Sequence, residues 1–345
     1  MAVEIVFKEG NDVANSVYGK SQDPIKMFIE KKAEAFEAES IAKKIFTHEK
    51  SNNYAERVTS MTAMKDFEAV GENGLYPSNS MEESYSKTLT HMTWKSAFGI
   101  TQEMVEDSKL MDLKKQPAAF ITAYYRTREK FAAALLAGAM GSAGTITFGN
   151  RPGFDVTSAD NVQLFSKAHT AFNGSKNGVE AQSNLFANEF NVETLGALEC
   201  AMQDFYGDTG EVLDVAPDTI IIPNDYALKK AVFEAVGADK DPNSSNNGFN
   251  YQFGRWNIIV WPYLSQYIKQ YAPEDSKPWI LFDSRYNSEY AGAMWFERVP
   301  LNVHSTIDDE TDANVWRGRA RFSAGFNDWR AFAVGGVQGG SNLTL

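Results

Sequence analysis

The sequence has a single cysteine, Cys200, among its 345 residues, so it has no second cysteine for an internal disulfide. No stretch approaches the roughly 20 consecutive apolar residues that span a bilayer. The first residues have neither the basic flank nor the apolar core of a signal peptide. We therefore expect a protein of a reducing compartment that is not exported and has no membrane partner.

Motifs for catalysis and metal binding are scarce as well. The four histidines lie far apart, and there is no His-x-x-x-His or Cys-x-x-Cys pair of the kind that binds zinc. There is no phosphate-binding loop, and Met140 stands where a nucleophile elbow needs glycine. The sequence therefore predicts no catalytic residue, no cofactor site and no metal site.

Two features leave alternatives open. His169 opens a polar loop, where it is either a ligand or base, or a loop histidine that makes one hydrogen bond; we favour the second interpretation. The acidic run Asp308–Asp312 either binds a hard cation through its oxygens or forms a solvated turn between strands. We favour the turn.

Positive charge is in deficit, with 33 Lys and Arg against 45 Asp and Glu and a net charge of −12. Proteins that bind nucleic acid without sequence preference gain affinity when Lys and Arg release counterions from phosphates. This balance argues against a DNA-reading protein. Any contact with DNA is expected to be non-specific.

Apolar residues (43%) and aromatic residues (13%) suffice for a sizeable core. One long helix is predicted from Pro117, which suits a first helical position, to Ala139, with Gly138 near its end. Its predicted apolar stripe consists of Phe120, Tyr124, Phe131 and Leu135. Its predicted solvent-facing residues are Arg126, Arg128, Glu129 and Lys130. Thr101 is predicted to cap a shorter helix before it.

A β-hairpin is predicted before this helix. Residues 85–94 alternate as a strand does, a partner strand is expected at Ser60–Val70, and the Gly-, Asn- and Pro-rich segment Gly71–Ser80 forms the turn. Neither strand face is cleanly apolar, and an isolated two-stranded hairpin is marginal in water. We therefore expect the hairpin to pack on a neighbouring subunit.

The remaining segments predict a mixed α/β or α+β body. Residues 1–23 form an arm, and a charged helix over 24–46, capped by Asp23, has a thin apolar seam that suggests docking. A helix capped by Asn191, a strand at Thr219–Pro223, a helix at Asp225–Val236 and strands at Trp256–Leu264 and Trp279–Ser284 follow, before a β-rich tail from Ala293 to Val337. Six tryptophans in this half favour core or interface packing over a carbohydrate site.

Four segments carry a resemblance to a known family: Gln163–His169 (QLFSKAH), Asp218–Glu234 (DTIIIPNDYALKKAVFE), Arg255–Leu264 (RWNIIVWPYL) and Arg317–Phe332 (RGRARFSAGFNDWRAF). Together with the element order, they resemble the Hong Kong 97-type major capsid proteins of tailed phages, above all the head subunit of Mu-like phages. The resemblance implies an α+β phage major capsid fold. Its parts are an N-terminal arm and helix (1–53), an extended β-hairpin loop (54–100), a peripheral domain with the long spine helix (101–189 and 290–345) and an axial domain (190–289).

The resemblance also implies a function. The chain would be a non-enzymatic head protein that assembles into pentamers and hexamers of an icosahedral shell around double-stranded DNA. It would be found in the virion and be assembled in the cytoplasm of the bacterial host. The implied partners are further copies of itself, a scaffolding protein, a portal and a decoration protein. The residues expected at subunit contacts are Tyr85, Leu89, Met92, Trp94, Phe28, Phe36, Arg317, Arg319 and Arg321.

The three arginines follow a spacing of two, so in a strand they share one face and call for carboxylate partners, either from an adjacent subunit or from the same one. Two other functions stay open. An encapsulin-like nanocompartment would use a similar shell and would have a cargo site. A cytosolic hydrolase would have a Trp-lined cleft with convergent acid and base groups.

Overall fold

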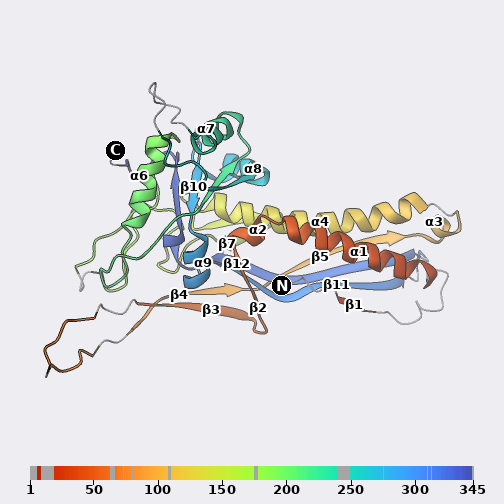
Figure 1. Cartoon of the computed structure of the whole chain (residues 1–345). Coiled ribbons are helices and arrows are strands. Elements are labelled where there is room, and N and C mark those ends of the chain that lie inside the picture. The colour runs from red at the N-terminus through yellow and green to blue at the C-terminus, as the bar shows by residue number, and fades with distance from the viewer. Residues whose placement is uncertain are drawn as a thin grey trace. The chain divides into compact units, whose positions relative to one another are not determined.

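The computed structural model describes residues 6–8, 19–62, 67–72, 74–78, 81–107, 110–174, 178–239, 249–274, 276–308, 310–311 and 313–343. Helices and strands are both abundant, as the α+β prediction requires (Figure 1). The chain divides into two compact units. Unit 1 comprises Met1–Glu56, Leu89–Phe131 and Trp295–Ala324, and unit 2 comprises Arg57–Thr88, Ala132–Met294 and Gly325–Leu345.

Unit 1 is built on a mostly antiparallel sheet in the order β1-β11-β12-β5, with β2 also paired to β11. Helices α1 and α4 cover one face of this sheet (Figure 1). The bounds of these elements are β1 Val6–Lys8, β2 Thr47–Lys50, β5 Met92–Ile100, β11 Ala293–Asp308, β12 Ala313–Phe326, α1 Gly19–Glu39 and α4 Leu110–Gly138. The core between helices and sheet contains Ile29, Ala33, Ile100, Phe120, Ile121, Tyr125, Leu301, Val303 and Trp316.

Helix α4 is the predicted long helix, and its stripe is buried as expected: Phe131 and Leu135 are 2% and 0% exposed. The helix starts at Leu110, however, so the prediction of a start at Pro117 is wrong, and the proline lies inside the helix. A proline removes one backbone hydrogen bond. The helix nevertheless runs for 29 residues. The core packing of residues after the proline, such as Phe120 and Ile121, stabilises the helical conformation despite the missing hydrogen bond.

The predicted solvent face of α4 is also partly wrong. Arg126 is exposed, but Arg128 is only 6% exposed. The guanidinium of Arg128 lies 3.7 Å from a carboxylate oxygen of Glu37 and 3.4 Å from one of Glu297. Helix α4 contacts α1 as well as the sheet, so a face that an amphipathic pattern assigns to water is covered by a second helix.

The charged helix after the arm is broken in two. It starts at Gly19 and not after Asp23, and α1 ends at Glu39 before the short helix α2 (Ala42–Ile45). The carboxylate of Glu129 accepts hydrogen bonds from the Ser40 hydroxyl at 2.5 Å and from the Ala42 backbone N–H, which satisfies the start of α2. The chain before α1, apart from β1, lies outside the described residues, and so does most of the predicted arm.

His48 is a half-buried histidine on β2. Its ring stacks on Trp295 with 5.4 Å between centroids, and its Nε2 atom is buried without a hydrogen-bond partner among the described residues. Burial, followed by the positive charges of Arg128 and Lys43, lowers the pKa of His48 to about 3. The imidazole is therefore neutral in the folded protein at neutral pH.

This shift predicts a pH-dependent loss of stability. His48 takes up a proton near pH 6.5 in the unfolded chain and only near pH 3 in the folded one. The stability that depends on its neutral form is therefore fully present above pH 6.5 and is lost as the pH falls from 6.5 to 3. From pH 7 to pH 5 the free energy of unfolding should fall by about 2 kcal/mol on account of this group alone. Urea titrations of the subunit and of His48→Phe at both pH values measure it. Equal pH slopes in the two proteins would contradict the assignment.

Unit 2 contains a four-stranded sheet in the order β13-β10-β8-β9, in which β8 and β9 are parallel and the other pairs antiparallel. Every residue of β8, β10 and β13 is buried, which explains why these strands appear in the sequence as short continuous apolar runs. Their bounds are β8 Thr219–Pro223, β9 Asn257–Trp261, β10 Trp279–Phe282 and β13 Phe332–Gly335, and the helices of this unit are α6 Val192–Gln203, α7 Tyr226–Gly237, α8 Pro262–Tyr271 and α9 Ser284–Tyr290.

Most local predictions for unit 2 are confirmed. Asn191 caps α6 and Asp225 caps α7, each by accepting a backbone N–H. The strand predicted to reach Leu264 ends at Trp261, because Pro262 begins α8. All six tryptophans of this half are at most 8% exposed, which confirms core packing: Trp256, Trp261, Trp279, Trp295, Trp316 and Trp329.

The two strands of the hairpin are formed by residues other than the predicted ones. Strand β3 (Ala55–Met61) pairs with β4 (Glu83–Thr90), so the partner strand ends near where it was expected to begin. The strand predicted over residues 85–94 ends at Thr90, and β5 pairs with β12 instead. The reason is packing: Trp94 stacks on Phe322 and contacts Phe131, which holds this part of the chain in the unit 1 sheet. A further short hairpin joins β6 (Thr145–Phe148) and β7 (Arg151–Asp155).

Candidate assembly surfaces

The base of the β3–β4 hairpin is anchored within unit 2. The Ser84 hydroxyl donates to a carboxylate oxygen of Asp208 at 2.5 Å, and the Lys87 ammonium lies 2.5 Å from a carboxylate oxygen of Asp155. The ring of Tyr85 meets Phe172 edge-on with 5.4 Å between centroids. The root of the hairpin is therefore held by its own chain, which fixes where its far end emerges.

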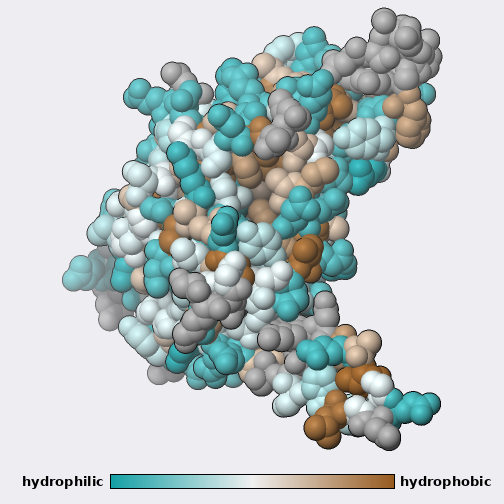
Figure 2. All heavy atoms as spheres, turned by 90° about the vertical axis from the view of Figure 1, so that its left-hand side faces the viewer, coloured by the Kyte–Doolittle hydropathy of each residue, from teal (hydrophilic) through white to brown (hydrophobic). Residues whose placement is uncertain are grey.

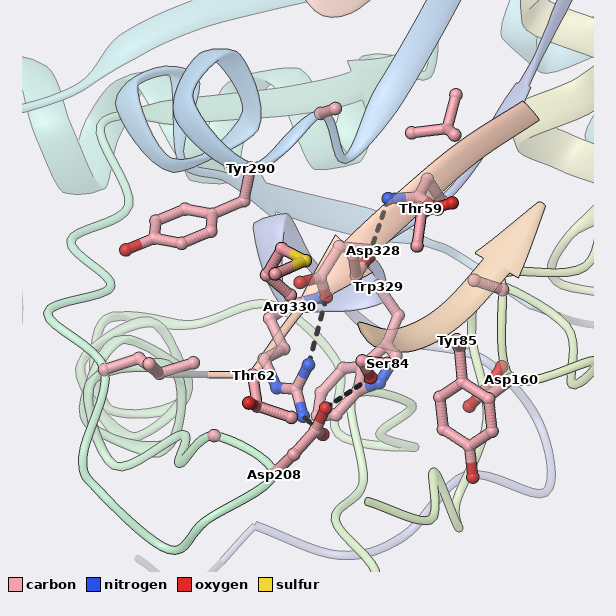
Figure 3. A pocket seen from close by; sticks show the side chains of 18 of the residues that line it. Thr59, Thr62, Ser84, Tyr85, Asp160, Asp208, Tyr290, Asp328, Trp329 and Arg330 are labelled. Atoms are coloured by element: carbon pink, nitrogen blue, oxygen red, sulfur yellow. Dashed lines mark hydrogen bonds and ion pairs between the residues drawn. The ribbon is translucent and has the colours of Figure 1, made fainter. Parts of the chain in front are cut away.

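A pocket of about 450 Å³ lies beneath this root (Figure 3). Arg330 points into the space between Asp208 and Asp328, at 3.0 and 3.5 Å from their carboxylates. Burial opposes its charge, but the two carboxylates outweigh burial and raise the pKa of Arg330. Because Arg330 pairs with both carboxylates and Asp208 also accepts the hydrogen bond of Ser84, the pocket strengthens the anchorage of the hairpin.

The far end of the hairpin is exposed. Phe67, Leu75 and Tyr76 are 99%, 91% and 96% exposed, and Val70 and Met81 are about half exposed. In the space-filling view, hydrophobic residues lie at the surface among hydrophilic ones on the projecting segment at the lower right (Figure 2). Large apolar side chains gathered on one exposed segment mark an interaction surface. We call residues 67–83 the hairpin end.

The hairpin end is also acidic. From Phe67 to Glu83 the sequence has four carboxylates and no Lys, Arg or His. Among the described residues, no cation lies within ion-pair distance of its exposed carboxylates: Glu68, Glu72, Glu82 and Glu83. The surface therefore combines apolar contact area with an unneutralised negative charge.

Unit 1 has a surface of the opposite charge. It contains Lys95, Arg317, Arg319 and Arg321, and we call it the cationic face. Trp94 and Phe322 point into the core, so the alternating residues of β5 and β12 lie on the other side of the sheet. Arg319 is paired directly across from Lys95. A hollow of about 550 Å³ on this side is lined by Lys95, Ala97, Arg317 and Arg319 together with Asn302 and His304.

The apolar residues expected at subunit contacts are mostly engaged within their own chain. Leu89 is 5% exposed, Trp94 stacks on Phe322, and Phe36 stacks on Tyr125 with 5.3 Å between centroids. Tyr85, Met92 and Phe28 are half-buried. Arg317 and Arg319 are exposed and Arg321 is half-buried, so the three arginines do share a face. Phe67, Leu75 and Tyr76 were not among the residues predicted at subunit contacts; the one clue to them in the sequence is the pair Leu75–Tyr76 inside a turn-like segment.

His169 is a buried structural residue and makes more than the single hydrogen bond expected. Its Nδ1 lies 2.6 Å from Asp160, its Nε2 lies 3.2 Å from Asn184, and its ring stacks on Trp329 with 4.3 Å between centroids. Burial would raise the pKa of Asp160, but the hydrogen bond and charge of His169 hold it below its ordinary value. This histidine cross-links a loop to the core.

The described residues contain no group of three or more His, Cys, Asp or Glu side chains placed to hold a metal ion. In the acidic turn, Asp308 accepts a hydrogen bond from Thr311, and Asp309 and Asp312 lie outside the described residues. No helix in the described part of the chain is long and apolar enough to cross a bilayer.

A family model described as phage capsid protein matches residues 84–335, well over half of the sequence. The chain belongs to the phage capsid protein family. It is a major capsid protein: a structural protein of the virion that assembles with further copies of itself into a shell, and not an enzyme. The nanocompartment and hydrolase alternatives find no support.

Several solved structures are also similar to this chain. The Microbacterium phage Oxtober96 structure is 13% identical with a TM-score of 0.48, covering 86% of this chain and 90% of that one. The Mycobacterium phage Adephagia structure is 14% identical with a TM-score of 0.46, covering 89% and 90%. The capsid of Myoviridae phage XM1 is 11% identical with a TM-score of 0.45, covering 84% and 88%. No curated protein matches.

Proposed function

We propose that this chain is the shell-forming subunit of a tailed phage head of the Hong Kong 97 type, in its Mu-like variety. Its copies form the pentamers and hexamers of an icosahedral shell around double-stranded DNA. The observation that supports this most directly is the hairpin end, whose Phe67, Leu75 and Tyr76 side chains are almost fully exposed in the isolated chain. Such side chains gain free energy when a neighbour covers them, at about 25 cal/mol per Å² of apolar surface.

The division into parts follows the same proposal. Residues 1–53 form the arm and helix, 54–100 the extended loop, 101–189 and 290–345 the peripheral domain, and 190–289 the axial domain. Strand β13, which pairs with β10, adds residues 332–335 to the sheet of the axial segment, so the chain end contributes to that sheet. The subunit contacts include the hairpin end and Arg317, Arg319 and Arg321.

The physical mechanism is repetition of modest contacts. Each subunit contributes one projecting hairpin and receives another. Once neighbouring subunits are held by other contacts, the hairpin meets its binding surface within the same assembly, so the effective concentration of that surface is high. A net charge of −12 keeps packaged DNA from adhering tightly, so the contact with DNA carries no sequence preference. A scaffolding protein, a portal and a decoration protein are the expected partners, and assembly takes place in the cytoplasm of the bacterial host.

Deleting Gly71–Met81 tests the proposal. The root of the hairpin is anchored by Ser84, Tyr85 and Lys87, so the body should keep its melting temperature, whereas closed particles should disappear from negative-stain micrographs. Leu75→Ser should weaken assembly in the same direction. The matched control is Val212→Ser, at a residue that is 70% exposed but lies elsewhere in unit 2. Normal particles from the deletion variant would refute the role of the hairpin.

A further inference from the structure

The pocket of about 450 Å³ beneath the root of the hairpin carries an excess of negative charge, and its volume falls in the range of ligand pockets, about 300–1,000 Å³. Its wall holds one cation and four carboxylates: Arg330, Asp160, Asp208, Glu289 and Asp328. Arg330 is shared between Asp208 and Asp328, so one negative charge remains beside it. Because this guanidinium is already engaged by two carboxylates, the pocket attracts a cation and not an anion.

The outer edge of the pocket is formed by Glu289 and Tyr290, two exposed residues at the end of helix α9. Among the described residues no cation lies within ion-pair distance of Glu289, since Arg285, one turn earlier, pairs with Asp214 instead. The ring of Tyr290 stacks on Tyr286 with 4.4 Å between centroids and is still 46% exposed. A carboxylate next to an accessible aromatic ring is an arrangement that binds organic ammonium groups.

The spacing of the carboxylates decides which kind of cation fits. No three His, Cys, Asp or Glu side chains of the described residues are placed to hold one metal ion. Tyr290 lies at the top of the close-up and Asp208 at the bottom, and the wall also includes the apolar Val58, Met61 and Leu213 (Figure 3). A linear molecule with an ammonium group at each end and methylene groups between them matches this distribution of charge and apolar surface.

Asn327 adds an acceptor that has no donor. Its side chain lies on the pocket wall and the residue is 3% exposed. The amide N–H donates to the Ser60 hydroxyl at 3.0 Å, whereas the Oδ1 atom has no hydrogen-bond partner among the described residues. A buried acceptor without a donor costs free energy, which a ligand N–H recovers.

We propose that this pocket binds a linear aliphatic diamine. One ammonium group lies between Glu289 and the ring of Tyr290, and the other lies beside Asp208 and Asp328, next to Asn327. The methylene chain lies along the apolar wall. Because strands β3 and β4 supply part of that wall, the bound diamine joins the root of the hairpin to the rest of unit 2.

Calorimetric titration of the unassembled subunit with cadaverine, a five-carbon diamine, tests the proposal. We expect saturable binding of one cadaverine per subunit. Pentylamine, which has the same chain and a single charge, should bind at least about threefold more weakly. Glu289→Gln and Tyr290→Leu change exposed residues, so the subunit should stay folded, and each should weaken the binding of cadaverine at least about threefold.

Glu234→Gln is the matched control, because it removes the same charge at an exposed residue of helix α7. It should leave the affinity for cadaverine unchanged. An equal loss in Glu234→Gln and Glu289→Gln would mean that only the net charge of −12 attracts the diamine, and would overturn the proposal. So would the absence of saturable binding, equal affinities for cadaverine and pentylamine, or an affinity that neither pocket variant changes. The titration involves no assembly, so the hairpin deletion still decides the proposed function separately.

Discussion

Replacing Phe131 by alanine is expected to lower the free energy of unfolding by about 3–5 kcal/mol. The ring is 2% exposed and lies against three other aromatic rings of unit 1: Trp94 at 5.3 Å, Trp295 at 6.0 Å and Phe322 at 6.2 Å between centroids. Truncation removes the buried apolar surface and leaves a cavity that the three remaining rigid rings cannot collapse to fill. Urea denaturation of the unassembled subunit measures the loss.

Phe233→Ala is the control for this prediction. Phe233 lies on helix α7 and is 49% exposed, so the same truncation there should cost much less than in the core. An unchanged denaturation midpoint for Phe131→Ala would remove this residue from the core of unit 1. The comparison separates the cavity from any general effect of losing a phenyl ring.

Arg128→Met should be about as damaging, with a loss of about 3–5 kcal/mol at pH 7. The guanidinium is buried between Glu37 and Glu297 and stacks over Trp295 at 5.1 Å. Burial raises the pKa of Glu297, and the charge of Arg128 counteracts that rise. Without the arginine, the half-buried carboxylate of Glu297 loses its ion pair and that of Glu37 keeps only Lys43, at 3.1 Å, which is the main cost.

The pH dependence and a triple variant check this explanation. Lowering the pH protonates the unpaired carboxyl groups, so the deficit of Arg128→Met relative to the parent should shrink as the pH falls. Arg128→Met combined with Glu37→Gln and Glu297→Gln should recover most of the stability, because a buried ionic group replaced as a whole costs little. A deficit that stays constant with pH and persists in the triple variant would point to lost packing instead.

The errors of the sequence analysis have a common cause. Arg128 lies where the amphipathic pattern of α4 predicts solvent, and the pattern describes one helix at a time without the helix that covers it. Residues 85–94 alternate as one strand, yet the chain divides at His91 because Trp94 packs in another sheet. Phe67 and Tyr76 carry no period at all, and only their position on a projecting segment shows that they are exposed.

The sequence by itself determined the local structure and the class of protein. Caps such as Asn191 and Asp225, the stripe of α4 and the apolar strands of unit 2 depend on near neighbours in the chain, so a linear pattern records them. The tertiary structure alone decided strand partners, the burial of Arg128 and the gathering of Lys95, Arg317 and Arg319 on one face. These depend on contacts between residues far apart in sequence, whose free energy appears only when the chain has packed.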